Sequence, residues 1–98
     1  MDTFISVIVP VYNEELVIRE MYQRLTSVFK SNNYDYELIF VNDGSTDNTL
    51  TLAKELCETD KSVKLLSFSR NFGHQIAVTA GIDRAKGQVI VIIDADLQ

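Results

Sequence analysis

Four short runs of β-branched and aromatic residues alternate with segments of helical periodicity along this chain. The runs cover residues 4–10, 36–41, 63–68 and 89–93. The three segments between them carry apolar residues at three- and four-residue steps, which is typical of helices with one buried face. This βαβαβαβ order predicts a three-layer α/β/α fold, in which a mainly parallel sheet has helices on both faces.

The composition of the runs predicts where each strand lies in the sheet. Residues 4–10 end at the only proline, Pro10, and suit a central parallel strand. Residues 89–93 are uninterrupted Val and Ile, which predicts a buried strand. Residues 63–68 are interrupted by Lys64, so we expect this strand toward an edge of the sheet.

Small and polar residues are expected to shape the connections. Asn13 can cap the first helix, which we expect to begin at Glu14. Gly44 permits an unusual backbone turn after the second strand. Gly87 is placed to end the third helix, which we expect over residues 73–86.

Composition excludes some classes of partner. The 98 residues suit one domain, and their net charge of −5, with no clustered Lys/Arg face evident in the sequence, argues against a nucleic-acid partner. The single cysteine, Cys57, cannot form an internal disulfide and is expected to be a small buried hydrophobe. No stretch reaches the roughly 18 apolar residues of a membrane span, so we expect this stretch of chain to be soluble.

The residues able to do chemistry all follow predicted strands. They fall in residues 10–14, 43–45, 69–74 and 94–98. In open parallel sheets, ligands lie beyond the carboxyl ends of the strands, near a switch in strand order. We therefore expect a single ligand site at that edge of the sheet.

Two carboxylates, Asp94 and Asp96, directly follow the last strand. They could form a solvated turn, or they could bind a cation, because Mg²⁺ and Mn²⁺ favour carboxylate, phosphate and water oxygens. Gln98 offers a neutral carbonyl on the same side. The second interpretation predicts a metal site that receives a nucleotide diphosphate.

Three further residues have both a structural and a functional interpretation. Asp43 is either a turn former or an acceptor for a base N–H. Arg70 could hold phosphate, stack on a base, or form a surface salt bridge. His74, the only histidine, is expected to be a capping or surface residue rather than a catalytic base.

Several nucleotide-binding folds are disfavoured by missing motifs. The chain has neither a Gly-x-x-x-x-Gly-Lys-Ser/Thr loop nor a Gly-x-Gly-x-x-Gly sequence after its first strand. These absences argue against a P-loop NTPase and against a dinucleotide-binding Rossmann domain. A phosphoacceptor receiver domain is also disfavoured, because the first strand ends in Pro-Val-Tyr where acids would be needed.

Residues 7–14 (VIVPVYNE), residues 41–47 (VNDGSTD) and the Asp94-Ala95-Asp96 triplet together resemble the inverting family 2 glycosyltransferases of the GT-A fold. Residues 69–75 (SRNFGHQ) and 94–98 (DADLQ) resemble the branch that transfers sugars to polyprenyl phosphates, which includes dolichyl-phosphate mannose synthases. The resemblance extends over essentially the whole chain. It implies the Rossmann-like nucleotide-binding half of a GT-A fold.

The resemblance also implies roles for individual residues. It implies a nucleotide pocket formed by Pro10, Val11, Tyr12, Glu14, Asp43, Arg70, Asp94 and Ala95. It implies that Asp96, Asp94 and Gln98 bind Mg²⁺ or Mn²⁺. The implied reaction is direct displacement, with inversion, of UDP or GDP from a nucleotide-diphosphate sugar by a polyprenyl phosphate at the cytoplasmic face of a membrane.

The chain stops at the metal motif, where members of the family continue. We therefore expect residues 1–98 to be the N-terminal nucleotide-sugar-binding half, without the acceptor half and without transfer activity of its own. The apolar strand at residues 89–93 is expected to leave an unpaired edge that favours self-association. Two alternatives stay open: a polysaccharide or cell-wall glycosyltransferase with an alcohol acceptor, and a non-catalytic nucleotide-binding module.

Overall fold

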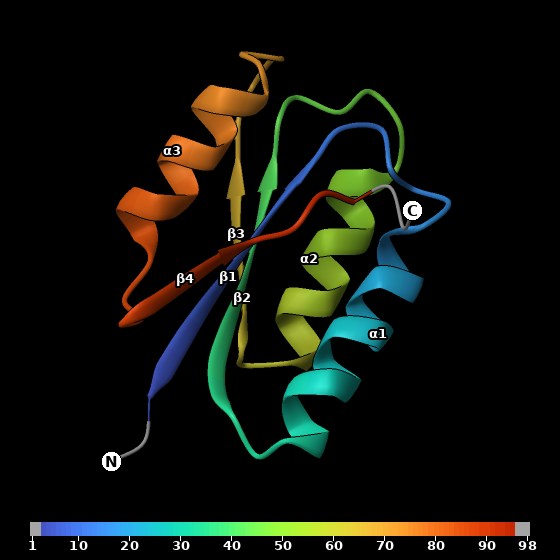
Figure 1. Cartoon of the computed structure of the whole chain (residues 1–98). Coiled ribbons are helices and arrows are strands. Elements are labelled where there is room, and N and C mark those ends of the chain that lie inside the picture. Colours follow the sequence, from blue (N-terminus) through green and yellow to red (C-terminus); the bar gives the residue numbers. More distant parts are fainter. Residues whose placement is uncertain (1–2, 96–98) are drawn as a thin grey trace.

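The computed structural model describes residues 3–95, and within this range the elements follow one another in the predicted βαβαβαβ order (Figure 1). The elements are β1 (Phe4–Val11), α1 (Ile18–Ser31), β2 (Asp35–Asn42), α2 (Thr49–Thr59), β3 (Val63–Ser67), α3 (His74–Arg84) and β4 (Val89–Ile92). No helix among the described residues is long and apolar enough to span a membrane.

The four strands form one parallel sheet in the order β3-β2-β1-β4. Strands β1 and β2 are central and pair over eight residues, from Phe4 beside Asp35 to Val11 beside Asn42. The central position of β1 and the edge position of β3 confirm the sequence predictions.

Strand β4 is not buried, contrary to the prediction. It pairs with β1 on one side, and no other strand of residues 3–95 pairs with its outer edge. Val89, Ile90 and Ile92 are consequently 41–46% exposed. The apolar composition of this strand therefore reflects a surface that the described residues leave uncovered.

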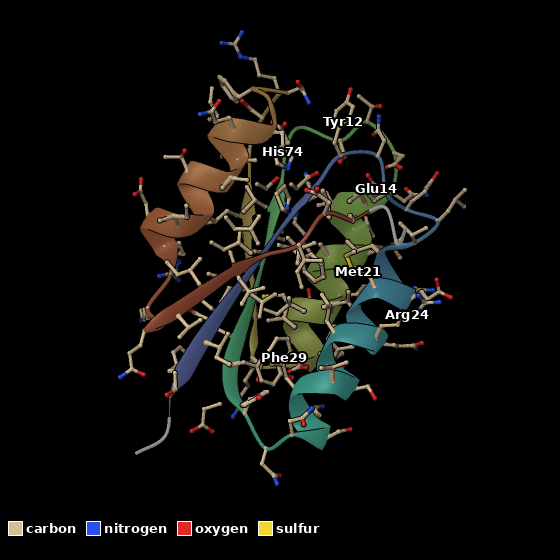
Figure 2. All side chains as sticks on the ribbon, viewed as in Figure 1. Tyr12, Glu14, Met21, Arg24, Phe29 and His74 are labelled. Atoms are coloured by element: carbon tan, nitrogen blue, oxygen red, sulfur yellow. The ribbon has the colours of Figure 1, made fainter. Side chains whose placement is uncertain are left out.

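Helices cover both faces of the sheet, which gives the three layers predicted (Figure 1). Helices α1 and α2 lie on the face that carries Val7, Val9 and Phe40, and side chains of the sheet and of these two helices fill this core (Figure 2). Helix α3 lies on the opposite face, where Ala77 packs against a smaller core of Ile8, Ile39 and Val41.

Small residues allow α3 to approach the sheet closely. A Cβ atom on Gly81 would lie 2.5 Å from the Cγ2 atom of Ile8. Gly87 has a related function, although it does not end the helix as expected. Helix α3 already ends at Arg84, and a Cβ atom on Gly87 would lie 2.6 Å from the backbone nitrogen of Ser6, so this glycine lets the chain pass close to β1.

Candidate functional site

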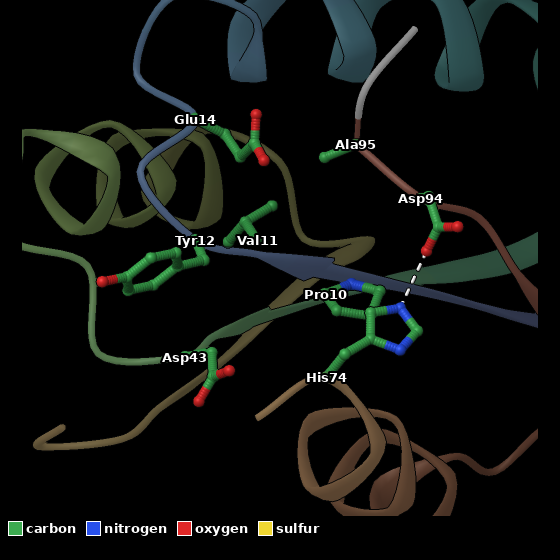
Figure 3. Close-up of a pocket in the computed structure, with 8 residues that line it drawn as sticks. All are labelled: Pro10, Val11, Tyr12, Glu14, Asp43, His74, Asp94 and Ala95. Carbon is green, nitrogen blue, oxygen red and sulfur yellow. Dashed lines mark hydrogen bonds and ion pairs between the residues drawn. The ribbon is translucent and has the colours of Figure 1, made fainter. Parts of the chain in front are cut away.

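A cavity lies at the carboxyl end of the sheet, at the edge where the sequence predicts a ligand (Figure 3). It has a volume of about 230 Å³, and we call it the carboxyl-end cavity. Its lining residues are Pro10, Val11, Tyr12, Glu14, Asp43, His74, Asp94 and Ala95. Seven of these eight residues belong to the nucleotide pocket that the sequence resemblance implies.

The strand order brings these distant residues together. Strand β1 lies between β2 and β4, so the segments that follow all three strands meet at one place. Two backbone hydrogen bonds extend the pairing beyond the strands: Asp43 N donates to Val11 O at 2.9 Å, and Ile93 N donates to Ile8 O at 2.9 Å. The backbone thereby fixes Asp43 and the start of the Asp94 turn relative to β1.

Asp43 is buried and holds the loop between β3 and α3. Its carboxylate accepts hydrogen bonds from the Phe72 backbone N–H at 2.7 Å, the Gly73 backbone N–H at 3.1 Å and the Asn71 side-chain amide at 3.2 Å. Through these contacts Asp43 stabilises a loop, which agrees with the structural interpretation of Asp43 as a turn former. Asp43 also lines the cavity, so the structural and the ligand-binding interpretations are compatible.

Gly44 lets two loops pack back to back beside Asp43. Its φ of +72° is the unusual turn that the sequence predicts. A Cβ atom at this position would lie 2.1 Å from the carbonyl carbon of Arg70. Only glycine therefore allows the β2–α2 loop and the β3–α3 loop to pack in this way.

Asn13 connects two loops and does not cap α1, which begins only at Ile18. Its backbone has a φ of +52°, and its side-chain oxygen accepts hydrogen bonds from the backbone N–H groups of Thr46 at 2.8 Å and Asp47 at 3.3 Å. In return, the Asn13 N–H donates to the Ser45 hydroxyl at 2.9 Å. The loop after β1 is thereby fixed against the loop after β2.

A hydrogen bond to the first residue of α2 positions Glu14. Its backbone N–H donates to the Thr49 hydroxyl at 2.8 Å, and Thr49 is fully buried. The Thr49 hydroxyl in turn donates to the Asp47 carboxylate, and the backbone N–H of Thr49, at the start of α2, donates to the same carboxylate. Asp47 therefore stabilises the amino end of this helix and also helps to place Glu14 in the cavity wall.

The lining residue that sequence reasoning missed is His74, which we expected to cap a helix or lie on the surface. Its Nε2 atom lies 2.8 Å from Oδ1 of Asp94, and both side chains are about two-thirds exposed (Figure 3). Its segment, residues 69–74, was expected at this edge of the sheet, although His74 itself was not placed in the nucleotide pocket. The pair links the start of α3 to the end of β4.

Other predicted site residues lie elsewhere. The exposed Arg70 is not part of the cavity lining, and its guanidinium carbon lies 4.7 Å from the centre of the Phe72 ring. Asp96 and Gln98 lie outside the described residues. The nucleotide role of Arg70 and the metal roles of Asp96 and Gln98 stay predictions.

The described residues contain only part of the predicted cation site. Within residues 3–95, no group of three or more His, Cys, Asp or Glu side chains is arranged to hold a metal ion. Asp94 is the one predicted metal ligand in this range, and it presents an exposed carboxylate at the mouth of the cavity. A carboxylate is the oxygen ligand that Mg²⁺ and Mn²⁺ prefer, so the described part of the predicted set is chemically suited to them.

Comparison with known proteins identifies the family. The Glycosyl transferase family 2 model matches residues 6–98. The chain is 59% identical over 93 residues to the uncharacterised glycosyltransferase YkcC of Bacillus subtilis, and 44% identical over 94 residues to the prophage bactoprenol glucosyl transferase homologue of Escherichia coli. It is 39% identical over 95 residues to an undecaprenyl-phosphate 4-deoxy-4-formamido-L-arabinose transferase of Pseudomonas fluorescens. These matches cover 95–96% of this chain but only 28–31% of each relative.

Solved structures show the same fold. The mannosyltransferase PcManGT of Pyrobaculum calidifontis, in complex with GDP-Man and Mn²⁺, superposes with a TM-score of 0.81 at 29% identity. TarS 1-349 of Staphylococcus aureus, in complex with UDP-GlcNAc, also gives a TM-score of 0.81, at 28% identity. Each match covers 98% of this chain and 27–28% of the other. The predicted α/β fold and its GT-A class are therefore confirmed.

Proposed function

The chain belongs to glycosyl transferase family 2, and we propose that residues 1–98 are the nucleotide-sugar-binding half of a glycosyltransferase that acts on a polyprenyl phosphate. The observation that carries this proposal is the meeting of the segments after β1, β2 and β4 at one cavity. The chain spans less than a third of its relatives, so the acceptor half is expected in sequence beyond it. We expect these residues alone to bind donor without transferring sugar.

The donor is a nucleotide-diphosphate sugar, either UDP- or GDP-linked. PcManGT binds GDP-Man and TarS binds UDP-GlcNAc in the structures that this chain resembles. In the carboxyl-end cavity, Pro10, Val11 and Tyr12 offer a largely apolar wall for a nucleoside. Asp43 accepts hydrogen bonds from its own loop, and an ionised carboxylate has about four lone-pair sites, so it retains capacity for a base N–H.

Asp94, Asp96 and Gln98 would hold Mg²⁺ or Mn²⁺ beside the diphosphate, and PcManGT contains Mn²⁺. When bound, the cation supplies positive charge opposite the departing diphosphate. His74 contributes by holding the Asp94 carboxylate at 2.8 Å, which limits the orientations of that side chain. Reduced side-chain freedom before binding lowers the entropic cost of assembling the site.

The acceptor is a polyprenyl phosphate at the cytoplasmic face of the membrane, and the sugar is transferred with inversion. Support comes from the bactoprenol and undecaprenyl-phosphate transferases among the relatives. A phosphate oxygen is already anionic near neutral pH, so its attack on the anomeric carbon requires no strong general base. In this proposal the carboxylates of the cavity serve to bind the donor and the cation, and no lining residue is assigned as a base.

Calorimetric titration with UDP and with GDP, each with and without Mn²⁺, tests the proposal. We expect Mn²⁺-dependent binding of one nucleotide, with Asp96→Ala abolishing that dependence. Asp83→Ala, which removes an exposed acid from α3, is the control and should leave binding unchanged. Nucleotide binding that is equally strong without Mn²⁺ and in Asp96→Ala would instead support a non-catalytic nucleotide-binding module.

A further inference from the structure

A second cavity lies at the amino ends of the strands, opposite the carboxyl-end cavity, and we call it the amino-end cavity. Its volume is about 320 Å³, within the roughly 300–1,000 Å³ range of small-molecule sites. Its lining residues are Phe4, Tyr36, Glu37, Lys61, Ser62, Lys64, Arg84 and Lys86. No residue is shared with the carboxyl-end cavity, so the two cavities are separate sites.

Cations from two separate segments converge on the amino-end cavity. They are Lys61 and Lys64, around the start of β3, and Arg84 and Lys86, at and just after the end of α3. These are four of the nine Lys and Arg residues in a chain whose net charge is −5. Within residues 3–95 none of the four forms a salt bridge, whereas Arg19 and Arg24 both do.

One buried acid, Glu37, lies in the same cavity. Its Oε2 atom accepts hydrogen bonds from the Ser6 hydroxyl at 2.6 Å and from the Lys86 backbone N–H at 2.8 Å. Glu37 therefore fixes the chain that leads from α3 into β4. A second acid, Asp60, accepts a hydrogen bond from the Ser62 backbone N–H at 2.9 Å beside the cavity. Two negative charges do not balance four cations, so the cavity retains an excess of positive charge.

Ordinary structural functions explain only part of this arrangement. Arg84 lies in the last turn of α3, where a cation interacts favourably with the helix dipole. That interaction does not account for Lys61 and Lys64, which belong to another segment. Like charges gathered around one concavity repel one another, and an anion bound between them relieves this repulsion.

We propose that the amino-end cavity binds a soluble, phosphate-bearing small molecule. Ammonium and guanidinium groups are the donors that bind phosphate most strongly in proteins. The concave shape, with Glu37 buried in it, favours a small ligand over a bilayer, because a flat surface reaches only the charges at the rim. The site is independent of the nucleotide-sugar site proposed above.

Titration of the ¹⁵N-labelled chain with inorganic pyrophosphate at low salt, followed by two-dimensional NMR, tests this proposal. We expect saturable shifts at the amides of Ser62, Lys64 and Lys86. The double variant K64Q/K86Q should bind about tenfold more weakly, because two charge-assisted contacts are lost. K64R/K86R should retain binding, and K30Q/K54Q, which makes the same charge change on α1 and α2, should bind within about twofold of the parent chain.

Three outcomes would overturn the proposal. The first is the absence of saturable shifts in the parent chain, a result that does not depend on any variant folding. The second is equal weakening by K64Q/K86Q and K30Q/K54Q, which would show a general charge effect. The third is binding only to phosphatidylcholine vesicles containing phosphatidylglycerol, with none to pyrophosphate, which would indicate a membrane surface.

Discussion

The carboxylate of Asp43 accepts a 2.7 Å hydrogen bond from the backbone N–H of Phe72, which lies 29 residues later in the chain. The contact joins the end of β2 to the loop before α3, and its acceptor, Asp43, is buried. It explains how one carboxylate can shape a wall of the carboxyl-end cavity even before a ligand binds.

Asp43→Ala should lower the free energy of unfolding by about 2–3 kcal/mol, because the N–H groups of Phe72 and Gly73 lose an ionised acceptor. Urea denaturation measures the change. Asp35→Ala, at an exposed position in β2, is the matched control and should cost less than about 0.5 kcal/mol. Equal effects of the two substitutions would argue against the loop-holding function of Asp43.

Gly44 and Gly73 offer a comparison of two glycines with positive φ in the same pair of loops. Gly44→Ala should destabilise the protein more, because its Cβ would meet the backbone of Arg70 at 2.1 Å, while Gly73 has nothing within 4 Å. Gly73→Ala should therefore show backbone strain alone, about 1–2 kcal/mol. Thermal unfolding of both variants checks the order, and a smaller loss for Gly44→Ala would contradict the packing of the two loops.

The sequence predicts those parts of this molecule that depend on local pattern. Composition and turn chemistry predict the succession of strands and helices along the chain, the edge position of β3 and the turn at Gly44. Placing Pro10 and Asp94 in one cavity required the additional rule that parallel strands end at the same edge. That rule succeeds because it depends only on topology.

What the sequence did not predict depends on contacts between distant segments. Asparagine is a residue type that often caps helices, yet the Asn13 side chain forms hydrogen bonds with residues more than 30 positions away. The amino-end cavity is a stronger case, since no segment of the chain is rich in Lys and Arg. The cations at Lys64 and Lys86 become neighbours only after α3 crosses back over the sheet.

Tyr22 and Asp60 make stability depend on pH. The Tyr22 hydroxyl donates to the Asp60 carboxylate at 2.5 Å, and this hydrogen bond, with burial, raises the pKa of Tyr22 to about 12. Because the pKa of Tyr22 is raised on folding, the stability that this hydrogen bond contributes is complete below pH 10, the pKa in the unfolded chain. It is lost as the pH rises to about 12, the pKa in the folded chain. Burial opposes ionisation of Asp60, but hydrogen bonds from Tyr22 and Ser62 outweigh it and lower its pKa.

Tyr22→Phe should therefore cost about 1 kcal/mol at neutral pH and flatten the loss of stability between pH 10 and 12. The Asp60 contribution is present above its unfolded pKa of 3.8 and is lost as the pH falls through its lowered value, so the variant should also be less acid-sensitive. Urea titrations across the pH range measure both effects. Tyr34→Phe, at an exposed position, is the control. If Tyr22→Phe lost as much free energy of unfolding between pH 10 and 12 as the parent chain does, this account would be contradicted.

His74→Ala should weaken Mn²⁺-dependent nucleotide binding by about three- to tenfold, because Asp94 loses the contact that orients it. Stability should change by less than about 0.5 kcal/mol, since both side chains are largely exposed. Calorimetry and thermal unfolding give the two readouts, and Gln75→Ala, the exposed neighbour, is the control. Unchanged binding in His74→Ala would remove His74 from the proposed site.

Strand β4 presents an apolar edge that should drive self-association of this chain. Val89, Ile90 and Ile92 are exposed beside a row of backbone groups that no strand of residues 3–95 covers, and such edges template pairing with a second copy. We expect light scattering to show a mass that rises with protein concentration. Ile90→Lys should suppress the rise, because a charged side chain blocks edge-to-edge pairing, whereas Val28→Lys, at an exposed position on α1, should not. A parent chain that stays monomeric at high concentration would show that the edge is protected in another way.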